Sequence, residues 1–109
     1  MTDFTFSVEN SDDAIAWIDF YHRKTRKTTR INFDTSGDTV DLSLDPGSYV
    51  VSCNMIGKDG DKMTVSAAVG DADPEAIAEF TLVAGGMGTR DLPGGKLLGF
   101  GTNLWTVEP

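Results

Sequence analysis

Apolar and polar side chains alternate in several short segments of this chain, and this pattern constrains the fold most. The clearest case is residues 39–44, in which Val40, Leu42 and Leu44 alternate with polar residues. A period of two residues places successive side chains on opposite faces of a β-strand. Similar segments occur at 4–8, 14–22, 29–33, 49–55, 63–69, 76–84 and 103–108. We therefore expect a chain built mainly from short, half-buried strands.

Turn-forming residues separate these segments. In residues 45–47, Asp-Pro-Gly, the proline suits the first central turn position and the glycine tolerates positive φ. The pair Asp59-Gly60 lies between two strand patterns and predicts a hairpin. Residues 75–80 also resemble the start of a helix behind Pro74, so a short helix is the alternative to a strand there. Seven glycines between residues 85 and 101 predict a mobile loop that leads to a broken apolar segment.

About eight short strands, spaced roughly ten residues apart and without a firm helix, predict an all-β protein. We expect an antiparallel two-sheet sandwich, immunoglobulin-like or jelly-roll-like, with a small barrel as the alternative. Residues 42–51 resemble the strand, Pro-Gly turn and tyrosine-containing strand of many immunoglobulin-like and prealbumin-like modules. The cysteine pair of antibody domains is absent, because the chain has one cysteine. Since no linker divides the 109 residues, a single domain over 1–109 is expected.

A basic segment at residues 22–30 contrasts with the acidic remainder of the chain. It carries five of the nine Lys and Arg residues and no carboxylate, so its charge is about +5. The other 4 basic and 17 acidic residues sum to about −13, within a net charge of −8. Because the segment lies between two strand patterns, we expect it at a hairpin tip and call it the basic hairpin. The residues predicted to bind a partner are Arg23, Lys24, Arg26, Lys27 and Arg30.

An acidic protein surface suits the basic hairpin better than a nucleic acid does. The acidic remainder repels a polyanion, and nucleic-acid-binding domains are usually basic, whereas this chain has an isoelectric point near 4.3. The partner can be another copy of the chain. Pairing of unlike patches between copies is heterologous and gives rings or filaments. The alternative is a solvated hairpin whose charges discourage edge-to-edge pairing.

Aspartates in the loops suggest calcium as an alternative cofactor. Successive connections of an antiparallel sandwich emerge alternately at its two ends, which gathers many loop aspartates at the end opposite the basic hairpin. Calcium takes about six to eight oxygen ligands. Aspartate also occurs in turns because it caps and bends them, and this is the competing interpretation. The candidate ligands are Asp12, Asp13, Asp34, Asp38, Asp59 and Asp61.

Residues 14–22 offer a candidate carbohydrate-binding or protein-binding face. Their alternation places Trp17, Asp19 and Tyr21 on one side of a strand, opposite a more apolar side. If the apolar side is buried, the two rings point outward about 13 Å apart, since a strand rises about 3.3 Å per residue. Two outward rings around a carboxylate suit a sugar or a protein anchor. Burial of Trp17 is the alternative, and the position of Trp105 is open in the same way.

Catalysis receives little support from the sequence. The one histidine and one cysteine would have to pair as a hydrolase dyad, but Cys53 lies on the apolar side of its segment while His22 adjoins the charged hairpin. No nucleophile elbow, phosphate-binding loop or histidine metal set occurs. We therefore expect a non-catalytic binding or assembly module that contacts protein through the basic hairpin and an acidic loop end. A carbohydrate-binding or calcium-binding module and a small hydrolase are the alternatives.

The chain is expected to be soluble. No apolar run is long enough to span a membrane, and the N-terminus lacks the pattern of a signal peptide. The single cysteine excludes an internal disulfide and favours a reducing compartment, the cytoplasm.

Overall fold

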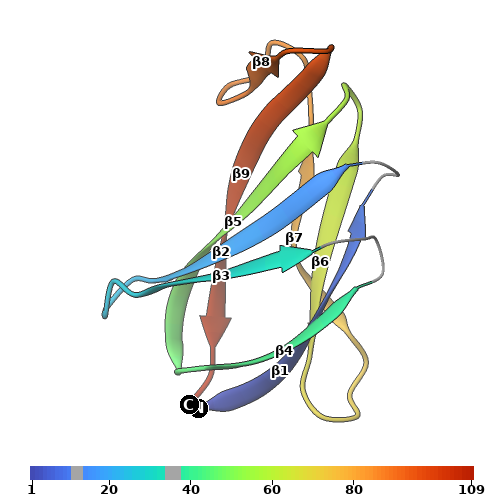
Figure 1. The fold of residues 1–109 in the computed structure, drawn as a ribbon. Helices are drawn as coiled ribbons and strands as arrows, with labels where there is room; N and C mark the ends of the chain where they lie inside the picture. Colours follow the sequence, from blue (N-terminus) through green and yellow to red (C-terminus); the bar gives the residue numbers. More distant parts are fainter. Residues whose placement is uncertain (11–13, 34–37) are drawn as a thin grey trace.

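The computed structural model describes residues 1–10, 14–33 and 38–109, which contain nine strands and no helix. These strands form two antiparallel sheets that pack face to face (Figure 1). The predicted two-sheet sandwich is confirmed, and the described strands do not close into a barrel. The strands are β1 (Thr2–Asn10), β2 (Ile15–His22), β3 (Thr28–Phe33), β4 (Thr39–Leu44), β5 (Gly47–Gly57), β6 (Lys62–Ala68), β7 (Glu75–Thr81), β8 (Arg90–Leu92) and β9 (Lys96–Val107).

The two sheets have different sizes. One has the order β4-β1-β6-β7, and the other has the order β3-β2-β5-β9-β8. Strand β8 pairs only with Lys96–Leu98 of β9. Among the described strands, the rest of β9 therefore has a neighbour on one side alone, which is β5. We call this unpaired side of β9 its free edge, and one of the candidate surfaces lies along it.

Inward side chains from both sheets build one core, as the alternation predicts. In β2, Ala16, Ile18 and Phe20 are buried, which leaves Trp17 on the outer side of the sheet. Trp105 instead points inward. Its ring centroid lies 5.1 to 6.1 Å from those of four core rings, a spacing typical of favourable aromatic contacts. These four rings belong to Phe4, Phe6, Phe20 and Tyr49.

Residues 75–80 form strand β7, so the alternative of a short helix is wrong. β7 pairs with β6 from Thr81, opposite Lys62, to Glu75, opposite Ala67. Ala78 is buried, and Phe80 packs against the core. Burial of these alternate side chains between two sheets outweighs the local helix signal of a preceding proline, since strand propensity depends largely on packing.

Strand β9 corrects the prediction for the glycine-rich segment. It begins at Lys96 and passes through Gly99 and Gly101, where a broken segment was expected before a strand from residue 103. A Cβ at Gly99 would lie 2.6 Å from Leu82 Cδ2, and one at Gly101 would lie 2.7 Å from Phe80 Cδ1. Because both glycines lack a side chain, they leave space for Phe80 of β7, in the opposite sheet, and for Leu82, which directly follows β7. They are packing positions inside a strand.

The Asp59-Gly60 pair does not close a hairpin, because β5 and β6 belong to different sheets. Leu82 fixes this connection. The Gly60 N–H donates to the Leu82 carbonyl, the Leu82 N–H donates to the Asp61 carbonyl, and both bonds measure 2.8 Å. The chain therefore crosses from one sheet to the other at residues 58–61.

Candidate interaction surfaces

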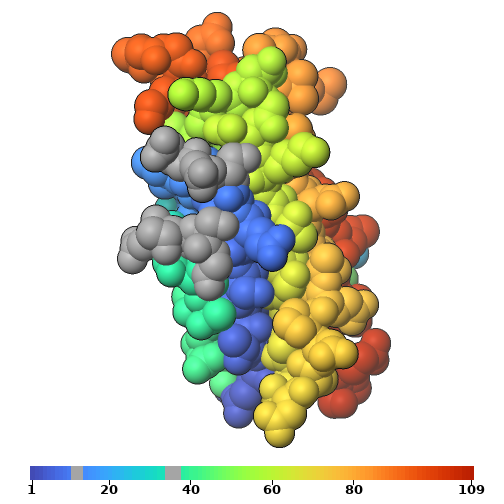
Figure 2. All heavy atoms as spheres, turned by 90° about the vertical axis from the view of Figure 1, so that its right-hand side faces the viewer, coloured from blue at the N-terminus to red at the C-terminus, as the bar shows by residue number. Residues whose placement is uncertain are grey.

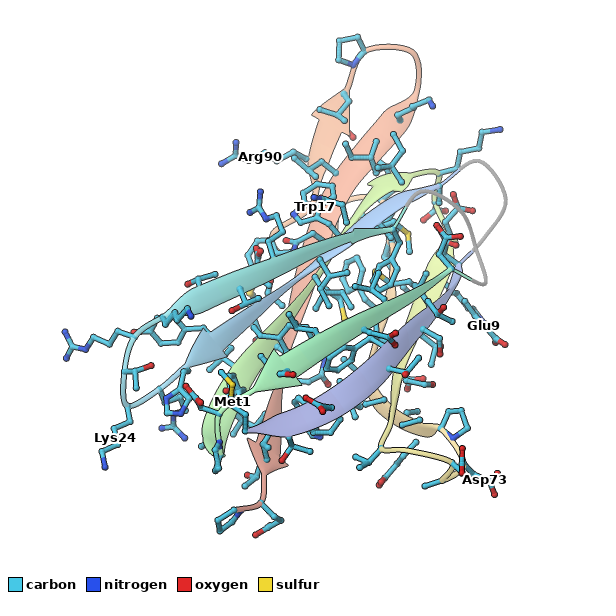
Figure 3. The ribbon with its side chains drawn as sticks, turned by 60° about the horizontal axis from the view of Figure 1, so that its bottom comes forward. Met1, Glu9, Trp17, Lys24, Asp73 and Arg90 are labelled. Carbon is cyan, nitrogen blue, oxygen red and sulfur yellow. The ribbon has the colours of Figure 1, made fainter. Side chains whose placement is uncertain are left out.

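The basic hairpin connects β2 to β3, as predicted. These strands pair from Ala16, opposite Phe33, to Tyr21, opposite Thr28. Lys24 projects from the tip (Figure 3). Four cationic residues at the tip are exposed, and within the described part of the chain none of their side chains makes an ion pair. These residues are Arg23, Lys24, Arg26 and Lys27.

His22 anchors the tip of the basic hairpin to the core. Its side chain is buried, and its ring lies edge-on to that of Tyr49 at a centroid distance of 4.9 Å. Nδ1 accepts hydrogen bonds from the backbone N–H groups of Lys24 and Thr25 at 3.2 and 3.1 Å. We therefore assign the proton to Nε2, which donates to the Pro46 carbonyl at 3.0 Å. These bonds tie the backbone of the turn to the buried ring of His22.

Arg26 has a left-handed backbone conformation, with φ at 61°. Two backbone bonds close the turn around it: its N–H donates to the His22 carbonyl at 2.8 Å, and the His22 N–H donates to the Lys27 carbonyl at 2.9 Å. A residue other than glycine loses about 1 kcal/mol in this region because its Cβ crowds the backbone. A cation thus occupies a position where glycine would fit with less strain.

Arg30 differs from the other predicted partner-binding residues, because Asp19 neutralises it. Arg30 Nε lies 2.7 Å from Asp19 Oδ1, and Nη2 lies 3.1 Å from Oδ2. The hydrogen bond and the charge of Asp19 raise the pKa of the Arg30 guanidinium. Sequence reasoning placed Asp19 between Trp17 and Tyr21 as a carboxylate for a ligand. In the structure this carboxylate is already paired, so among the described residues the hairpin keeps four cations without an ion pair, and Asp19 is not free for a ligand.

The outward side chains of the five-stranded sheet form a surface that we call the outer face, on which apolar residues lie among polar ones such as Asp19, Ser52 and Thr102. Tyr21 lies opposite Val50 in β5, and Val50 lies opposite Leu104 in β9. This row, the apolar row, starts at the base of the basic hairpin. Leu104 is 71% exposed, and Phe100, farther along β9, is 51% exposed. The polar row of Asp19, Ser52 and Thr102 separates the apolar row from Phe100. Large apolar side chains exposed on a folded protein often mark a binding surface.

The outer surface of the four-stranded sheet is polar by contrast. Figure 2 faces this surface, across which β4, β1, β6 and β7 follow in order. Carboxylates and hydroxyls on neighbouring strands pair there: Thr5 donates to Asp41 at 2.8 Å, and Ser43 donates to Asp3. The two faces of the sandwich therefore differ, because the outer face also carries the apolar row, which adjoins the basic hairpin.

Trp17 lines a hollow of about 240 Å³ on the outer face. Phe100 and Arg90 also line it. The Asn54 amide at its base is occupied, since Nδ2 donates to the backbone carbonyls of Trp17 and Ser52 at 3.4 and 3.1 Å. Carbohydrate binding at Trp17 and Tyr21 stays a prediction.

Asp59 and Asp61 lie at the end opposite the basic hairpin. The register places His22 opposite Tyr49 at one end of β5 and Ile15 opposite Ile56 at the other. Both carboxylates accept backbone hydrogen bonds, Asp59 from the Ala84 N–H at 2.9 Å and Asp61 from the Lys58 N–H at 2.8 Å. They cap turns, which is the role that aspartate commonly has there.

The other candidate calcium ligands do not form a site in the described part of the chain. Asp12, Asp13 and Asp34 lie outside the described residues, and the Asp38 carbonyl accepts a 3.3 Å bond from the Val8 N–H. No three potential metal ligands gather among the described residues. Four cationic residues also lie at this end of the molecule, namely Lys58, Lys62, Arg90 and Lys96. Calcium binding stays a prediction.

A groove of about 310 Å³ opens between the sheets along the free edge of β9, and we call it the edge groove. Phe4 and Trp105 contribute to its apolar lining, with their ring centroids 5.1 Å apart. Three exposed carboxylate residues also line it, namely Asp73, Glu75 and Glu108. Sequence reasoning missed the groove, since its position depends on how far β8 covers β9. The acidic loop 71–75 was the available signal.

His22 and Cys53 are not brought together. Cys53 lies opposite Ile18 in the register, four residues before His22 along β2, which corresponds to about 13 Å. Cys53 is buried, and burial raises the pKa of its thiol to about 12. Because both ring nitrogens of His22 already make hydrogen bonds, this histidine has a structural role.

Comparison with known proteins gives no relative. A scan against protein-family models found no match, and searches of curated proteins and of solved structures found no significant one. Within the described residues there is no helix long and apolar enough to cross a membrane.

Proposed function

We propose that this protein is a non-catalytic assembly module that binds another copy of itself through the basic hairpin and the adjoining apolar row. The observation that carries the proposal is a hydrogen-bonded turn with four exposed cations, unpaired within the described residues, and a row of apolar side chains that begins at its base. Protein interfaces combine a desolvated apolar centre with a charged rim in this way. Anchoring of the tip by His22 lowers the entropy lost when the cations become ordered on binding.

A second copy supplies the acidic surface that the basic hairpin requires. Outside residues 22–30 the chain has a charge of about −13. Such a surface attracts a short cationic loop at close range and repels an extended polyanion such as nucleic acid. A hairpin that docks head-to-tail on the acidic surface of the next copy makes a heterologous contact, which extends into rings or filaments.

Sedimentation velocity over a range of protein concentrations tests this proposal. We expect oligomers at about 0.1 M salt and their dissociation at about 1 M salt, where ionic screening acts over only about 3 Å. The variant Lys24→Glu/Lys27→Glu and the variant Leu104→Ser should each reduce association. A wild-type chain that stays monomeric at millimolar concentration in both salt conditions contradicts the proposal.

Arg26→Gly provides a control that separates binding from folding. It removes one cation and also relieves the strained backbone at φ 61°. Its melting temperature should therefore be at least that of the wild type, while its association is weaker. Equal association of this variant and the wild type would exclude Arg26 from the contact.

Binding of a small ligand is the second candidate function, and the hollow beside Trp17 favours it. An aromatic wall with a nearby arginine suits a sugar carrying an acidic group. A thermal melt with simple sugars, and with millimolar calcium against a chelator, tests both alternatives. Ligand that binds the folded state raises the melting temperature, so an unchanged melt excludes them.

A further inference from the structure

We infer that the edge groove of one copy receives the basic hairpin of the next. This inference rests on the proposed self-association and names the surface on the receiving copy. The groove is an opening in the sandwich because β8 covers only Lys96–Leu98, which leaves the side of β9 near Trp105 without a neighbouring strand among those described. Its volume is about 310 Å³. It has room for side chains.

The lining of the edge groove suits a long cationic side chain. Trp105 contributes an indole ring, and Phe4, Ala67 and Ile77 contribute further apolar surface. Arginine and lysine bury their aliphatic stems against such a surface while the charged end remains at the rim. A guanidinium or ammonium group over an indole face also gains a cation–π attraction.

Three carboxylates at the groove match the charge of the hairpin. Asp73 and Glu75 come from the connection into β7 and its first residue, and Glu108 directly follows β9. No three potential metal ligands gather within the described residues. Because the three carboxylates do not converge on one point, they suit several cations of one loop better than a single bound ion. The opposite end of the molecule carries lysines and an arginine as well as its described aspartates, so the groove is the better complement.

The hairpin of a molecule does not reach its own groove. The sheet order places β3 at one edge, and β9 lies on the far side of β2 and β5. Lys24 and Asp73 project from opposite flanks of the molecule (Figure 3). A hairpin on one flank and a groove on the other join copies side by side. This arrangement is heterologous and leaves a free hairpin and a free groove at the two ends of each assembly.

A charge-swap experiment tests the pairing. Hairpin reversal is Lys24→Glu/Lys27→Glu, and groove reversal is Asp73→Lys/Glu108→Lys. All four positions are exposed and lie outside the strands, so both variants should fold. We expect each reversal to weaken self-association at least about tenfold. The chain that carries both reversals should regain association, and its net charge equals that of the wild type.

A matched control separates the groove from general charge. Glu9→Lys/Glu79→Lys changes the net charge as groove reversal does, but on exposed positions of the four-stranded sheet. It should leave the association close to that of the wild type. Equal weakening by this control and by groove reversal would overturn the inference.

Fluorescence of Trp105 reports occupation of the groove. The chain has two tryptophans, so Trp17→Phe leaves Trp105 as the only indole. Its emission should shift as the protein associates at about 0.1 M salt, and hairpin reversal should abolish the shift. If the wild type associates and hairpin reversal dissociates it, but groove reversal and Trp105 emission show no effect, the groove inference fails and the proposed function stands. If the wild type never associates, both fail.

Discussion

Gly101→Ala gives the most direct test of the packing between the two sheets. A Cβ at this position would lie 2.7 Å from Phe80 Cδ1 and 3.4 Å from Cε1. Favourable carbon contacts lie at about 3.5 to 4.0 Å, so the new methyl group overlaps the ring by roughly 1 Å. The backbone of β9 has little freedom to move away, because Gly101 pairs with Cys53 in the centre of β5.

Two opposing effects set the size of the destabilisation. Overpacking a core by one methyl group costs about 1 to 3 kcal/mol. Replacing glycine with alanine also reduces the entropy of the unfolded chain, which stabilises the folded state by about 0.4 to 1 kcal/mol. The overlap is the larger effect, and we expect a net loss of about 1 to 2 kcal/mol in the free energy of unfolding. For a domain of this size that corresponds to a melting temperature lower by about 5 °C or more.

Urea denaturation of a double-mutant cycle measures the effect. In a Phe80→Ala background the ring is absent, so Gly101→Ala should be neutral or stabilising there. Thr102→Ala, at the neighbouring outward position, is the control and should change stability by less than about 0.5 kcal/mol. If Gly101→Ala is neutral in the wild type, or equally destabilising in both backgrounds, the proposed contact between Phe80 and β9 is wrong.

Three further predictions concern single side chains. The Cys53 thiol has a pKa of about 12 in the folded protein and an ordinary value of 9.0. Because the unfolded chain loses this proton first, the free energy of unfolding should fall by about 1.4 kcal/mol per pH unit between these two values. In Cys53→Val this part of the pH dependence should be absent. His22→Leu leaves two N–H groups of the tip without their acceptor, and should increase amide exchange at Lys24 and Thr25. Arg30→Ala should lower stability only slightly, measured by urea denaturation, because the Arg30 side chain is 58% exposed and solvent screens its ion pair with Asp19.

The strands were predictable wherever one face of a segment is buried. In β2, inward Ile18 and Phe20 alternate with outward Trp17 and Asp19, and a period of two conveys this directly. The basic hairpin followed from the same logic, since a polar segment between two such strands must turn. The resemblance of residues 42–51 to a strand, Pro-Gly turn and strand also corresponds to β4, its turn and β5.

The errors share one physical cause, which is that contacts between the sheets are not visible in a local pattern. Gly99 and Gly101 suggested a broken segment, but they lie within β9, where Leu82 and Phe80 fill the space beside them. Asp59-Gly60 suggested a hairpin, but hydrogen bonds to Leu82 direct the chain into the other sheet. The pairing of Asp19 with Arg30 was equally hidden, although both residues were singled out separately. Each case depends on a partner more than ten residues away in the chain.

The net charge of −8 makes two copies of the protein repel each other, and the salt concentration sets the distance over which this repulsion acts. Two such charges about 28 Å apart, the intermediate dimension of the molecule, repel by roughly 9 kcal/mol in water without salt. Screening reduces this repulsion to about 4 kcal/mol at 0.01 M salt and to about 0.6 kcal/mol at 0.1 M. A pair of opposite charges at about 4 Å retains roughly two thirds of its attraction at 0.1 M but only about a quarter at 1 M.

Association through the basic hairpin should therefore be strongest at intermediate salt. At the lowest ionic strength the long-range repulsion between whole molecules exceeds the short-range attraction, and at about 1 M salt the attraction itself is screened. A protein held together by its apolar row alone would instead associate more strongly as salt increases, because only the repulsion would respond. The presence of a maximum at intermediate salt therefore distinguishes association through the four cations at the hairpin tip from association through Tyr21, Val50 and Leu104 alone.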